Sequence, residues 1–289
     1  MSERLFLRLD DDPLHGPEAN VPADTLQAFA VSAPLRRHVS HILLYRETVP
    51  EGEEVVERVL PDGAVRLVFN LGDVPSSGHN GGQPAQAIGA SAEAALVRLR
   101  RKVEGLSVTL RPGAAAALLG MPAGEVGGAV VPLDALWRGA GAELLARIAE
   151  QPDDAARVAV LSAALQRRLR DGDAAVHAAA MHAARLIAAS GGRRPLREVA
   201  AAVGVGERRL QQLFHAHVGL SPRAWRRLAR LHACLRALRL QQMPAWADVA
   251  VDSGFYDQSH LVNEFRALCG LTPTEFFGRA VSGSSKTPG

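Results

Sequence analysis

The first 110 residues alternate short apolar runs with turn-forming residues. Runs rich in β-branched residues are typical of strands, and six of them cover residues 38–47, 53–60, 64–72, 85–90, 95–102 and 105–111. In the third run, Val65, Leu67 and Phe69 are spaced two residues apart, so their side chains share one face of the strand. Arg66 and Asn70 then point to the opposite face. The run is therefore predicted to be a strand with one apolar side.

Two further patterns interrupt and then replace the strands. Turn-forming residues fill positions 74–84, where we expect a flexible loop. From Pro112 the apolar spacing becomes helical, and helices are predicted over residues 112–120, 141–150, 153–170 and 173–189. The pair Gly191-Gly192 ends the last of these, because glycine terminates helices. We place the domain boundary there.

The remainder of the chain contains an internal repeat with an offset of 50 to 51 residues. The matching positions are Val199, Ala200 and Gly204 with Val249, Ala250 and Gly254, then Leu210, Phe214 and 219–222 with Leu261, Phe265 and 270–273. Each copy is predicted to form a short helix, a turn with glycine and a second helix, which ends at a glycine and is followed by a proline. This order is typical of a helix-turn-helix unit.

The second helix of the first copy has two opposite faces. Leu210, Leu213 and Phe214 form its apolar face. Its polar face combines residue types suited to base edges, namely Arg208, Gln211, Gln212 and His215. Arginine pairs with guanine and glutamine with adenine in the major groove, although the same pattern also fits a merely solvated face.

A longer helix is predicted between the copies, over residues 222–239. It carries four arginines at the spacing of a single helix face, which are Arg223, Arg226, Arg227 and Arg230. A solvated face usually carries acidic residues too, but none occurs between Arg208 and Asp248. We therefore expect this stripe to contact DNA phosphates, which fix the register of a protein on the duplex.

The charge distribution points to the same segment. The net charge is +3 for the 289 residues, but residues 190–240 hold 11 basic and 2 acidic side chains, whereas residues 241–289 hold 3 and 5. A positive field concentrated in about fifty residues is the signature of a polyanion-binding surface. The partner that this predicts is double-stranded DNA.

Residues 196–280 resemble the DNA-binding domain of AraC-type bacterial transcription regulators. The motifs that carry the resemblance are V-A-x-x-V-G, R-x-L-Q-Q-L-F, G-L-S-P-R, G-F-Y-D-Q-S-H-L-x-x-x-F-R over 254–266, and G-L-T-P-x-E-F. Proteins of that family hold two helix-turn-helix units joined by a long helix. The resemblance implies a transcription regulator, here expected to be an activator that works with RNA polymerase.

The resemblance also implies which side chains meet DNA. Helices starting near Glu207 and Asp257 would enter successive major grooves. The base-contacting positions are then Arg208, Gln211, Gln212 and His215 in the first unit, and Gln258, Ser259, Val262 and Asn263 in the second, with His260 also near the helix start. Arg209 and Arg266 join the arginine stripe as expected phosphate contacts.

The chain departs from the family pattern at the residues that cap the two reading helices. Gly206 and Tyr256 stand where the family usually has Ser or Thr. Glycine caps a helix with little penalty, but tyrosine is a poor cap, so Asp257 is expected to take that role. The second reading helix is therefore expected to begin at one of two adjacent residues.

The N-terminal part resembles a domain found in some AraC-type regulators of unassigned ligand. The similar segments are R-V-L-P-D-G from Arg58 with the following L-x-F-x-L-G-D, and R-P-G-A-A-A-A-L-L-G from Arg111. By analogy, this part would sense an unknown small-molecule effector and form a homodimer. The expected fold is α+β, with a small β-barrel-like sheet domain with helices at 1–190, an all-α DNA-binding domain at 193–280 and a flexible tail at 281–289.

No catalytic chemistry is evident in the N-terminal part. His38 and His41 would lie on opposite faces of a strand, and His79 falls in the loop, so no metal site is predicted. Nucleophile-elbow, P-loop and dinucleotide motifs are missing, and residues 1–233 hold no cysteine for a methyl-acceptor reaction. We expect neither an enzyme nor a cofactor, while a barrel enzyme fused to a DNA-binding module is the remote alternative.

Two readings of the N-terminal part stay open, an effector sensor and a ligand-independent dimerising scaffold. A sensor needs an apolar pocket with a few polar groups, and the candidates are Arg58, Asp62, Arg66 and Asn70. Outward-facing side chains are the simpler alternative for all four.

The cysteine content and the N-terminus suggest a cellular location. Cys234 and Cys269 allow no disulfide framework and form no C-x-x-C pair, so both are expected in the core. The N-terminus is acidic where a secretory signal would be apolar, and no window reaches 18 consecutive apolar residues. A cytoplasmic protein without membrane segments is predicted.

Overall fold

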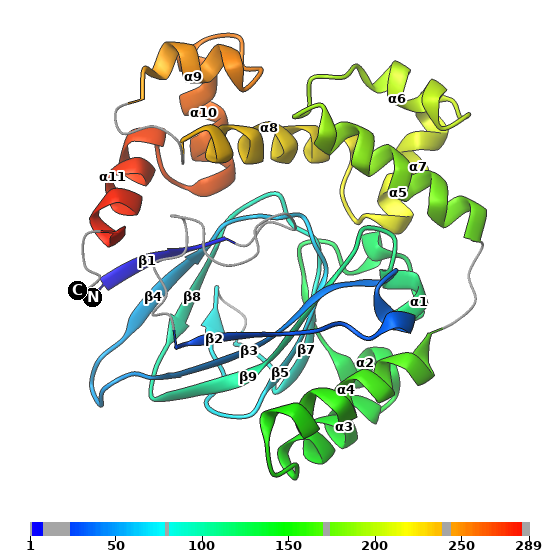
Figure 1. Cartoon of the computed structure of the whole chain (residues 1–289), viewed down its shortest axis with the longest axis vertical. Helices are drawn as coiled ribbons and strands as arrows, with labels where there is room; N and C mark the ends of the chain where they lie inside the picture. Colours follow the sequence, from blue (N-terminus) through cyan, green and yellow to red (C-terminus); the bar gives the residue numbers. More distant parts are fainter. Residues whose placement is uncertain (1, 8–23, 79–80, 170–173, 239–243, 285–289) are drawn as a thin grey trace.

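The computed structural model describes residues 2–7, 24–78, 81–169, 174–238 and 244–284. The N-terminal part holds two β-sheets, and the C-terminal part forms a layer of helices above them (Figure 1). The predicted α+β class is thereby confirmed.

The two sheets are open, and the predicted barrel-like closure is wrong within the described part of the chain. The smaller sheet has the order β1 (Ser2–Phe6), β4 (Val55–Val59), β8 (Ala95–Leu99) and β6 (Ser76–Ser77). The larger has the order β10 (Val130–Pro132), β7 (Ala85–Ile88), β5 (Arg66–Asn70), β9 (Lys102–Leu110), β3 (Val39–Thr48) and β2 (Leu26–Phe29). Strands β8 and β9 follow each other directly but join different sheets. The short connection between them contains Arg101, whose φ of 56° lies in the left-handed region.

All six apolar runs of the sequence contain a strand, and the alternation in β5 is confirmed. Val65, Leu67 and Phe69 pack into the core of the larger sheet with β3 and β9. That core also receives the helices α1 (Ala115–Leu119), α2 (Leu133–Trp137), α3 (Ala140–Ala149) and α4 (Asp154–Arg168). The predicted loop at 74–84 contains the short strand β6, and residues 79–80 lie outside the described residues.

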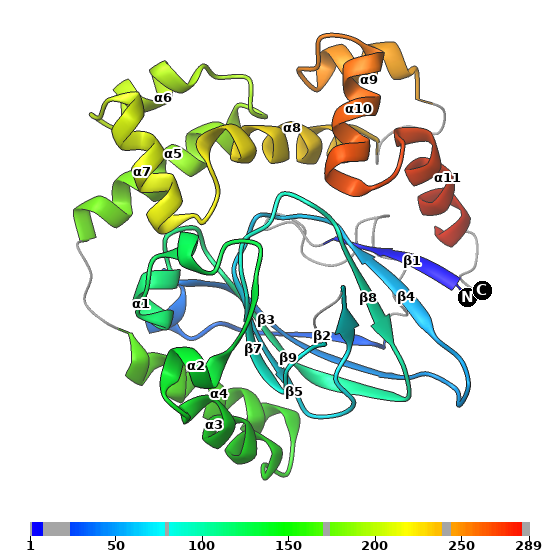
Figure 2. The same cartoon turned by 180° about the vertical axis from the view of Figure 1, so that it is seen from behind.

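The helical layer consists of two groups joined by α8 (Pro222–Leu238). The first group is α5 (Ala174–Ala189), α6 (Leu196–Ala202) and α7 (Glu207–His217), and the second is α9 (Trp246–Asp252), α10 (Gln258–Cys269) and α11 (Pro273–Ser284). Figure 2 shows α8 lying between the groups with the sheets beneath.

Helix α5 packs with the C-terminal helices. Ala183, Ala184 and Ile187 share a core with α6 and α7, and Trp225 Nε1 of α8 donates to the carbonyl oxygen of Ala184 at 3.1 Å. The sequence-based division into 1–190 and 193–280 places the boundary after α5. By its packing, however, α5 belongs to the helical layer. Of the predicted tail, residues 281–284 are helical and 285–289 lie outside the described residues.

The two parts of the protein share buried surface. Leu5, Leu7 and Leu60 of the N-terminal part are in one core with α8 and the second helical group. The chain ends are also tied together, since Arg279 Nη1 of α11 pairs with Glu3 Oε1 of β1 at 2.6 Å. These contacts fix the helical layer on the sheets.

Candidate DNA interface and ligand cavity

The first helix-turn-helix unit presents the predicted polar face to solvent. Its core holds Val199 and Ala200 of α6 against Leu210 and Phe214 of α7. On the opposite side of α7 the side chains of Arg208, Arg209, Gln211, Gln212 and His215 are exposed. Burial of the apolar stripe thus leaves arginine and glutamine groups available to a major groove.

The second unit begins its reading helix at Gln258. The Asp257 carboxylate caps the helix by accepting a hydrogen bond from the His260 amide at 2.7 Å, which confirms the expected shift of the cap. Tyr256, in the position before the cap, is 88% exposed. His260 is half-buried, and its ring packs edge-on against Phe255 with 5.5 Å between the ring centroids. His260 therefore lies against Phe255 and is only partly available to DNA.

The other predicted side chains of α10 differ in exposure. Gln258, Ser259, Asn263 and Arg266 are exposed, whereas Val262 is half-buried. The polar groups suited to base edges in this unit are consequently fewer and shorter than those of α7.

The arginine stripe on α8 is only partly available for DNA. Arg223 is exposed, but Arg226 Nε donates to the Gly192 carbonyl oxygen at 3.0 Å and Arg227 Nε pairs with Glu264 Oε2 at 2.7 Å. The guanidinium carbon of Arg230 lies 5.7 Å from the centre of the Phe255 ring. The pKa of Arg230 is lowered by burial and by the neighbouring arginines, partly offset by Glu264. The stripe thus also joins the two helix-turn-helix units.

A cavity of about 420 Å³ lies between the two sheets. Apolar side chains such as Leu43, Val59 and Val97 form much of its wall. Polar side chains from four neighbouring strands of the larger sheet complete it, namely His41, Tyr45, Arg66, Asn70, Gln86, Ser107 and Thr109. A mostly apolar wall with a few polar groups is the composition of a small-molecule site.

Three of the four predicted pocket residues line this cavity. Asp62 and Arg66 form an ion pair with each other. Asn70 is 5% exposed; its Oδ1 accepts from the Tyr45 hydroxyl at 2.5 Å, and its Nδ2 donates to the Gln83 carbonyl oxygen at 2.7 Å. Burial raises the pKa of Tyr45, so the phenol stays a neutral donor.

Arg58 lies elsewhere. It sits on β4, where its Nε pairs with Glu3 at 2.7 Å and its Nη1 donates to the Cys269 carbonyl oxygen at 3.1 Å. Its placement in the pocket is therefore wrong, because the strand directs it toward the second helix-turn-helix unit.

The sequence interpretation missed the polar row that crosses the strands. His41, Thr109 and Arg66 are register partners on β3, β9 and β5. The Thr109 hydroxyl is buried without a hydrogen-bond partner in the described part of the protein. The alternation of Ser107 and Thr109 with apolar residues along β9 is the signal that could have identified them.

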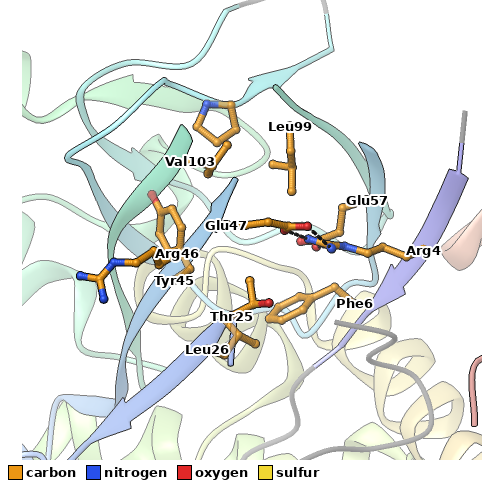
Figure 3. A pocket seen from close by; sticks show the side chains of 11 residues that line it. Arg4, Phe6, Thr25, Leu26, Tyr45, Arg46, Glu47, Glu57, Leu99 and Val103 are labelled. Atoms are coloured by element: carbon orange, nitrogen blue, oxygen red, sulfur yellow. Dashed lines mark hydrogen bonds and ion pairs between the residues drawn. The ribbon is translucent and has the colours of Figure 1, made fainter. Parts of the chain in front are cut away.

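A smaller cavity of about 60 Å³ adjoins the large one and shares Phe6, Leu26, Tyr45 and Pro75 with it. Figure 3 shows Arg4 reaching across to Glu47 and Glu57, with Arg46 pointing away from them. Arg4 pairs with Glu47 at 2.6 Å and with Glu57 at 2.8 Å. Burial raises the pKa of Glu57, and Arg4 counteracts that rise. The ion pairs join β1, β3 and β4 at this end.

The loop after β4 connects the large cavity to the helical layer. Pro61, Asp62 and Ala64 line the cavity, while the Pro61 carbonyl oxygen lies 2.9 Å from His232 Nε2 of α8. At Gly63 an added Cβ would lie 2.6 Å from the Trp225 ring, so glycine permits the close approach.

Within the described residues, no group of three or more His, Cys, Asp or Glu side chains could hold a metal ion. Both cysteines are buried, and burial raises the pKa of Cys234 to about 11. Among the helices that the structure describes, none has the length and apolar character needed to cross a bilayer.

Comparison with known proteins assigns the C-terminal helices. Residues 199–279 match the family model of a helix-turn-helix domain, and residues 27–132 match that of a domain of unknown function, DUF6597. The C-terminal part is an AraC-type helix-turn-helix domain. This domain supports DNA binding and transcription regulation by the chain.

Solved structures similar to the chain include two of ToxT from Vibrio cholerae. One, at 1.65 Å resolution, is 10% identical with a TM-score of 0.42, covering 88% of this chain and 98% of ToxT. Another, with an unsaturated fatty acid bound, is 11% identical with a TM-score of 0.42, covering 82% and 94%. No curated protein matches the chain.

Proposed function

We propose that the protein is a sequence-specific transcription regulator that reads two successive major-groove segments with α7 and α10. The observation that carries this proposal is the pair of helix-turn-helix units held on α8, each with polar side chains exposed along its second helix. In this proposal the base contacts of the first unit come from Arg208, Gln211, Gln212 and His215. Those of the second unit come from Gln258, Ser259, Val262 and Asn263. Arg209, Arg223 and Arg266 are exposed and suited to phosphates.

We further propose that a small molecule in the cavity between the sheets controls DNA binding. What supports an effector over a ligand-independent scaffold is the size and lining of the cavity. Arg66, Asn70 and Thr109 offer the polar groups that would orient such a molecule. Homodimer formation, contact with RNA polymerase, activation rather than repression, and a cytoplasmic location belong to the same proposal.

The DNA-binding part is tested by selecting duplexes from a random library with the full chain. The selected site should bind at least tenfold more tightly than a shuffled duplex. Arg208→Ala should cost about 1–3 kcal/mol on the selected site and little on the shuffled one. Equal losses on both duplexes would contradict base reading by Arg208.

The effector part is tested by a thermal-shift screen of metabolites on the full chain. A compound that binds only the folded state raises the unfolding midpoint. Val68 faces the cavity from β5, so Val68→Trp should fill the space and remove the shift. Leu136→Trp on α2, away from the cavity lining, serves as the control for added tryptophan. A hit that stabilises Val68→Trp as much as the wild type would contradict the cavity as its site.

A further inference from the structure

Three register rows of the larger sheet lie along the cavity, two of them polar and the middle one largely apolar. Across β5, β9 and β3 the rows are Arg66, Thr109 and His41, then Val68, Ser107 and Leu43, then Asn70, Gly105 and Tyr45. Since the smaller sheet contributes apolar side chains such as Val59 and Val97, a molecule in the cavity meets apolar surface from both sheets.

The polar groups of the third row already bind each other. The Tyr45 hydroxyl donates to Asn70 Oδ1 at 2.5 Å, and Asn70 Nδ2 donates to the Gln83 carbonyl oxygen at 2.7 Å. On β7, the buried Gln86 accepts from the Gln83 amide at 2.7 Å through its Oε1. A ligand would therefore meet side chains here whose hydrogen bonds are largely made.

Thr109 of the first row differs from these groups. It is 3% exposed and lines the cavity, and its hydroxyl has no hydrogen-bond partner in the described part of the protein. A buried hydroxyl without a partner costs free energy, which a hydrogen bond from a ligand would recover. Because a hydroxyl both donates and accepts, Thr109 can bind a ligand hydroxyl or a ligand carbonyl oxygen.

The charges around Thr109 are compensated within the protein. Arg66 pairs with one oxygen of the Asp62 carboxylate, and the other oxygen accepts from the Ala64 amide at 2.9 Å. Among the described residues that line the cavity, the other acidic or basic side chains are the exposed Glu93 and His41. A protonated His41 would at most offset Glu93, so no positive charge is left over for an anion.

This compensation disfavours a charged ligand of either sign. A carboxylate would compete with Asp62 for one guanidinium, and an ammonium group would compete with Arg66 for one carboxylate. Burying a charge without a partner is costly. The guanidinium carries more N–H groups than a single ion pair uses, so Arg66 can still donate to a neutral oxygen.

We propose that the cavity binds an uncharged molecule, with an apolar body along Val68 and Leu43 and a hydroxyl or carbonyl oxygen at Thr109. The proposal rests on the proposed function, in which this cavity holds the effector, and it names the chemical class of that effector.

Matched probes test the class of ligand. Octanol, octanoate and octylamine have the same chain length and differ in the charge of the head group, as do phenylbutanol, phenylbutanoate and phenylbutylamine. In calorimetric titrations of the full chain, the alcohol of each set should bind at least about tenfold more tightly than the acid and the amine. Val68→Trp, which fills the cavity, should abolish this binding. An acid or amine that binds the wild type as tightly as the alcohol, or an alcohol that binds Val68→Trp unchanged, would overturn the proposal.

Thr109→Val removes the hydroxyl and keeps the branched shape of the side chain. Alcohol affinity should fall by about 2- to 12-fold, the effect of one hydrogen bond. Because the hydroxyl has no partner in the described protein, the unfolding midpoint without ligand should stay unchanged or rise. Unchanged alcohol affinity, or a lower midpoint without ligand, would overturn the assignment of Thr109 to the ligand.

Asp62→Asn tests the charge compensation. Asparagine keeps an oxygen for the Ala64 amide but leaves Arg66 without its carboxylate, so octanoate should bind about tenfold more tightly than to the wild type, with octanol little changed. Glu51→Gln, which removes a carboxylate from an exposed turn outside the cavity lining, is the control. No gain for octanoate in Asp62→Asn would overturn the compensation argument, and if this variant does not fold, the comparison of probes on the wild type decides.

The same titrations separate this proposal from the proposed function. Failure of every probe to bind the wild type would overturn the cavity as a site for the proposed class of ligand. An alcohol that binds in the cavity but leaves the affinity for the selected duplex unchanged would instead contradict the control of DNA binding, while the class of ligand would stand.

Discussion

Arg227 of α8 and Glu264 of α10 form an ion pair at 2.7 Å that links the connecting helix to the second reading helix. Both side chains are partly buried. Because the pair fixes α10 on α8, it determines how the second unit presents its base-contacting side chains. This role is separate from any contact that Arg227 makes with phosphates.

Breaking this ion pair should affect one half of the binding site. We expect Arg227→Ala to lower affinity by about 1 kcal/mol or less, as is typical of partly exposed pairs. The loss should be accompanied by weaker discrimination at base pairs under α10, with those under α7 unaffected. Affinities for duplexes substituted in each half measure this.

Glu264→Gln provides the matched control for the ion pair. It removes the acidic partner without removing a basic residue, so a positioning role predicts the same loss of discrimination under α10. If Glu264→Gln instead binds all duplexes more tightly and with unchanged discrimination, the pair has no positioning role and Glu264 acts by its charge alone.

The salt dependence of DNA binding should distinguish the arginines of α8. With four to six phosphates neutralised, log affinity should fall with log salt at a slope of about −4 to −5 per protomer. Arg223 is exposed, so Arg223→Ala should reduce the slope by about 1. Arg230 packs beside Phe255, so we expect Arg230→Ala to leave the slope unchanged. Equal slope changes in both variants would show that burial does not separate their roles.

The strands were predictable because their apolar residues are buried on one side. Val65, Leu67 and Phe69 enter the core of the larger sheet while Arg66 and Asn70 face the cavity. The alternation is a local property, and it survives folding unchanged. The division into two sheets was not predictable, since it depends on which strands pair with β8 and β9 on either side of a short turn.

The candidate site, too, was predictable where spacing within one element decides the outcome, and not where contacts between distant segments decide it. Helical spacing correctly places Arg208 and Gln211 on an exposed face, because Leu210 and Phe214 determine which face is buried. Spacing cannot show what packs on an arginine stripe, and the partner of Arg227 lies 37 residues away in sequence. Arg58 is near Asp62 in sequence, but on β4 its side chain points to the face opposite that of Val59, which lines the cavity, so Arg58 lies outside it.

The ion-pair cluster around Glu104 should make the free energy of unfolding depend on pH in the acid range. Burial alone would raise the pKa of Glu104, but hydrogen bonds from Arg46, Lys102 and Arg157 lower it to about 2. A lowered pKa stabilises the folded state above the unfolded pKa of about 4.3, and this stabilisation is lost as pH falls toward 2. Glu104→Gln should therefore cost on the order of 3 kcal/mol at pH 7.

Urea unfolding of wild type and Glu104→Gln at several pH values between about 7 and 2 measures this dependence. The difference between the two proteins should be constant down to about pH 5 and then shrink. Glu54, directly before β4, is the control: hydrogen bonds from Arg98 and Arg100 also lower its pKa, but both arginine side chains are largely exposed, so solvent screens these pairs. A difference that persists at the lowest pH would mean that packing, and not ionisation, accounts for the loss in Glu104→Gln.

The two halves of the DNA site should be defined unequally. By the 51-residue offset, the face of α7 corresponds position by position to that of α10, and the pairs are Arg208 with Ser259, Gln211 with Val262, and Gln212 with Asn263. Val262 is half-buried and offers only apolar contact, for instance to a thymine methyl group, while Asn263 is exposed and suited to adenine. The acidic residues Asp257 and Glu264 also disfavour approach to phosphates. We expect single base-pair changes under α7 to cost about 1–3 kcal/mol and those under α10 distinctly less.

Systematic substitution across the selected duplex, with affinity measured at each position, provides the comparison. Val262→Gln should narrow the difference by adding a polar group at the position of Gln211. Equal costs under both helices in the wild type would show that exposure and side-chain type on α10 do not limit what the second unit reads.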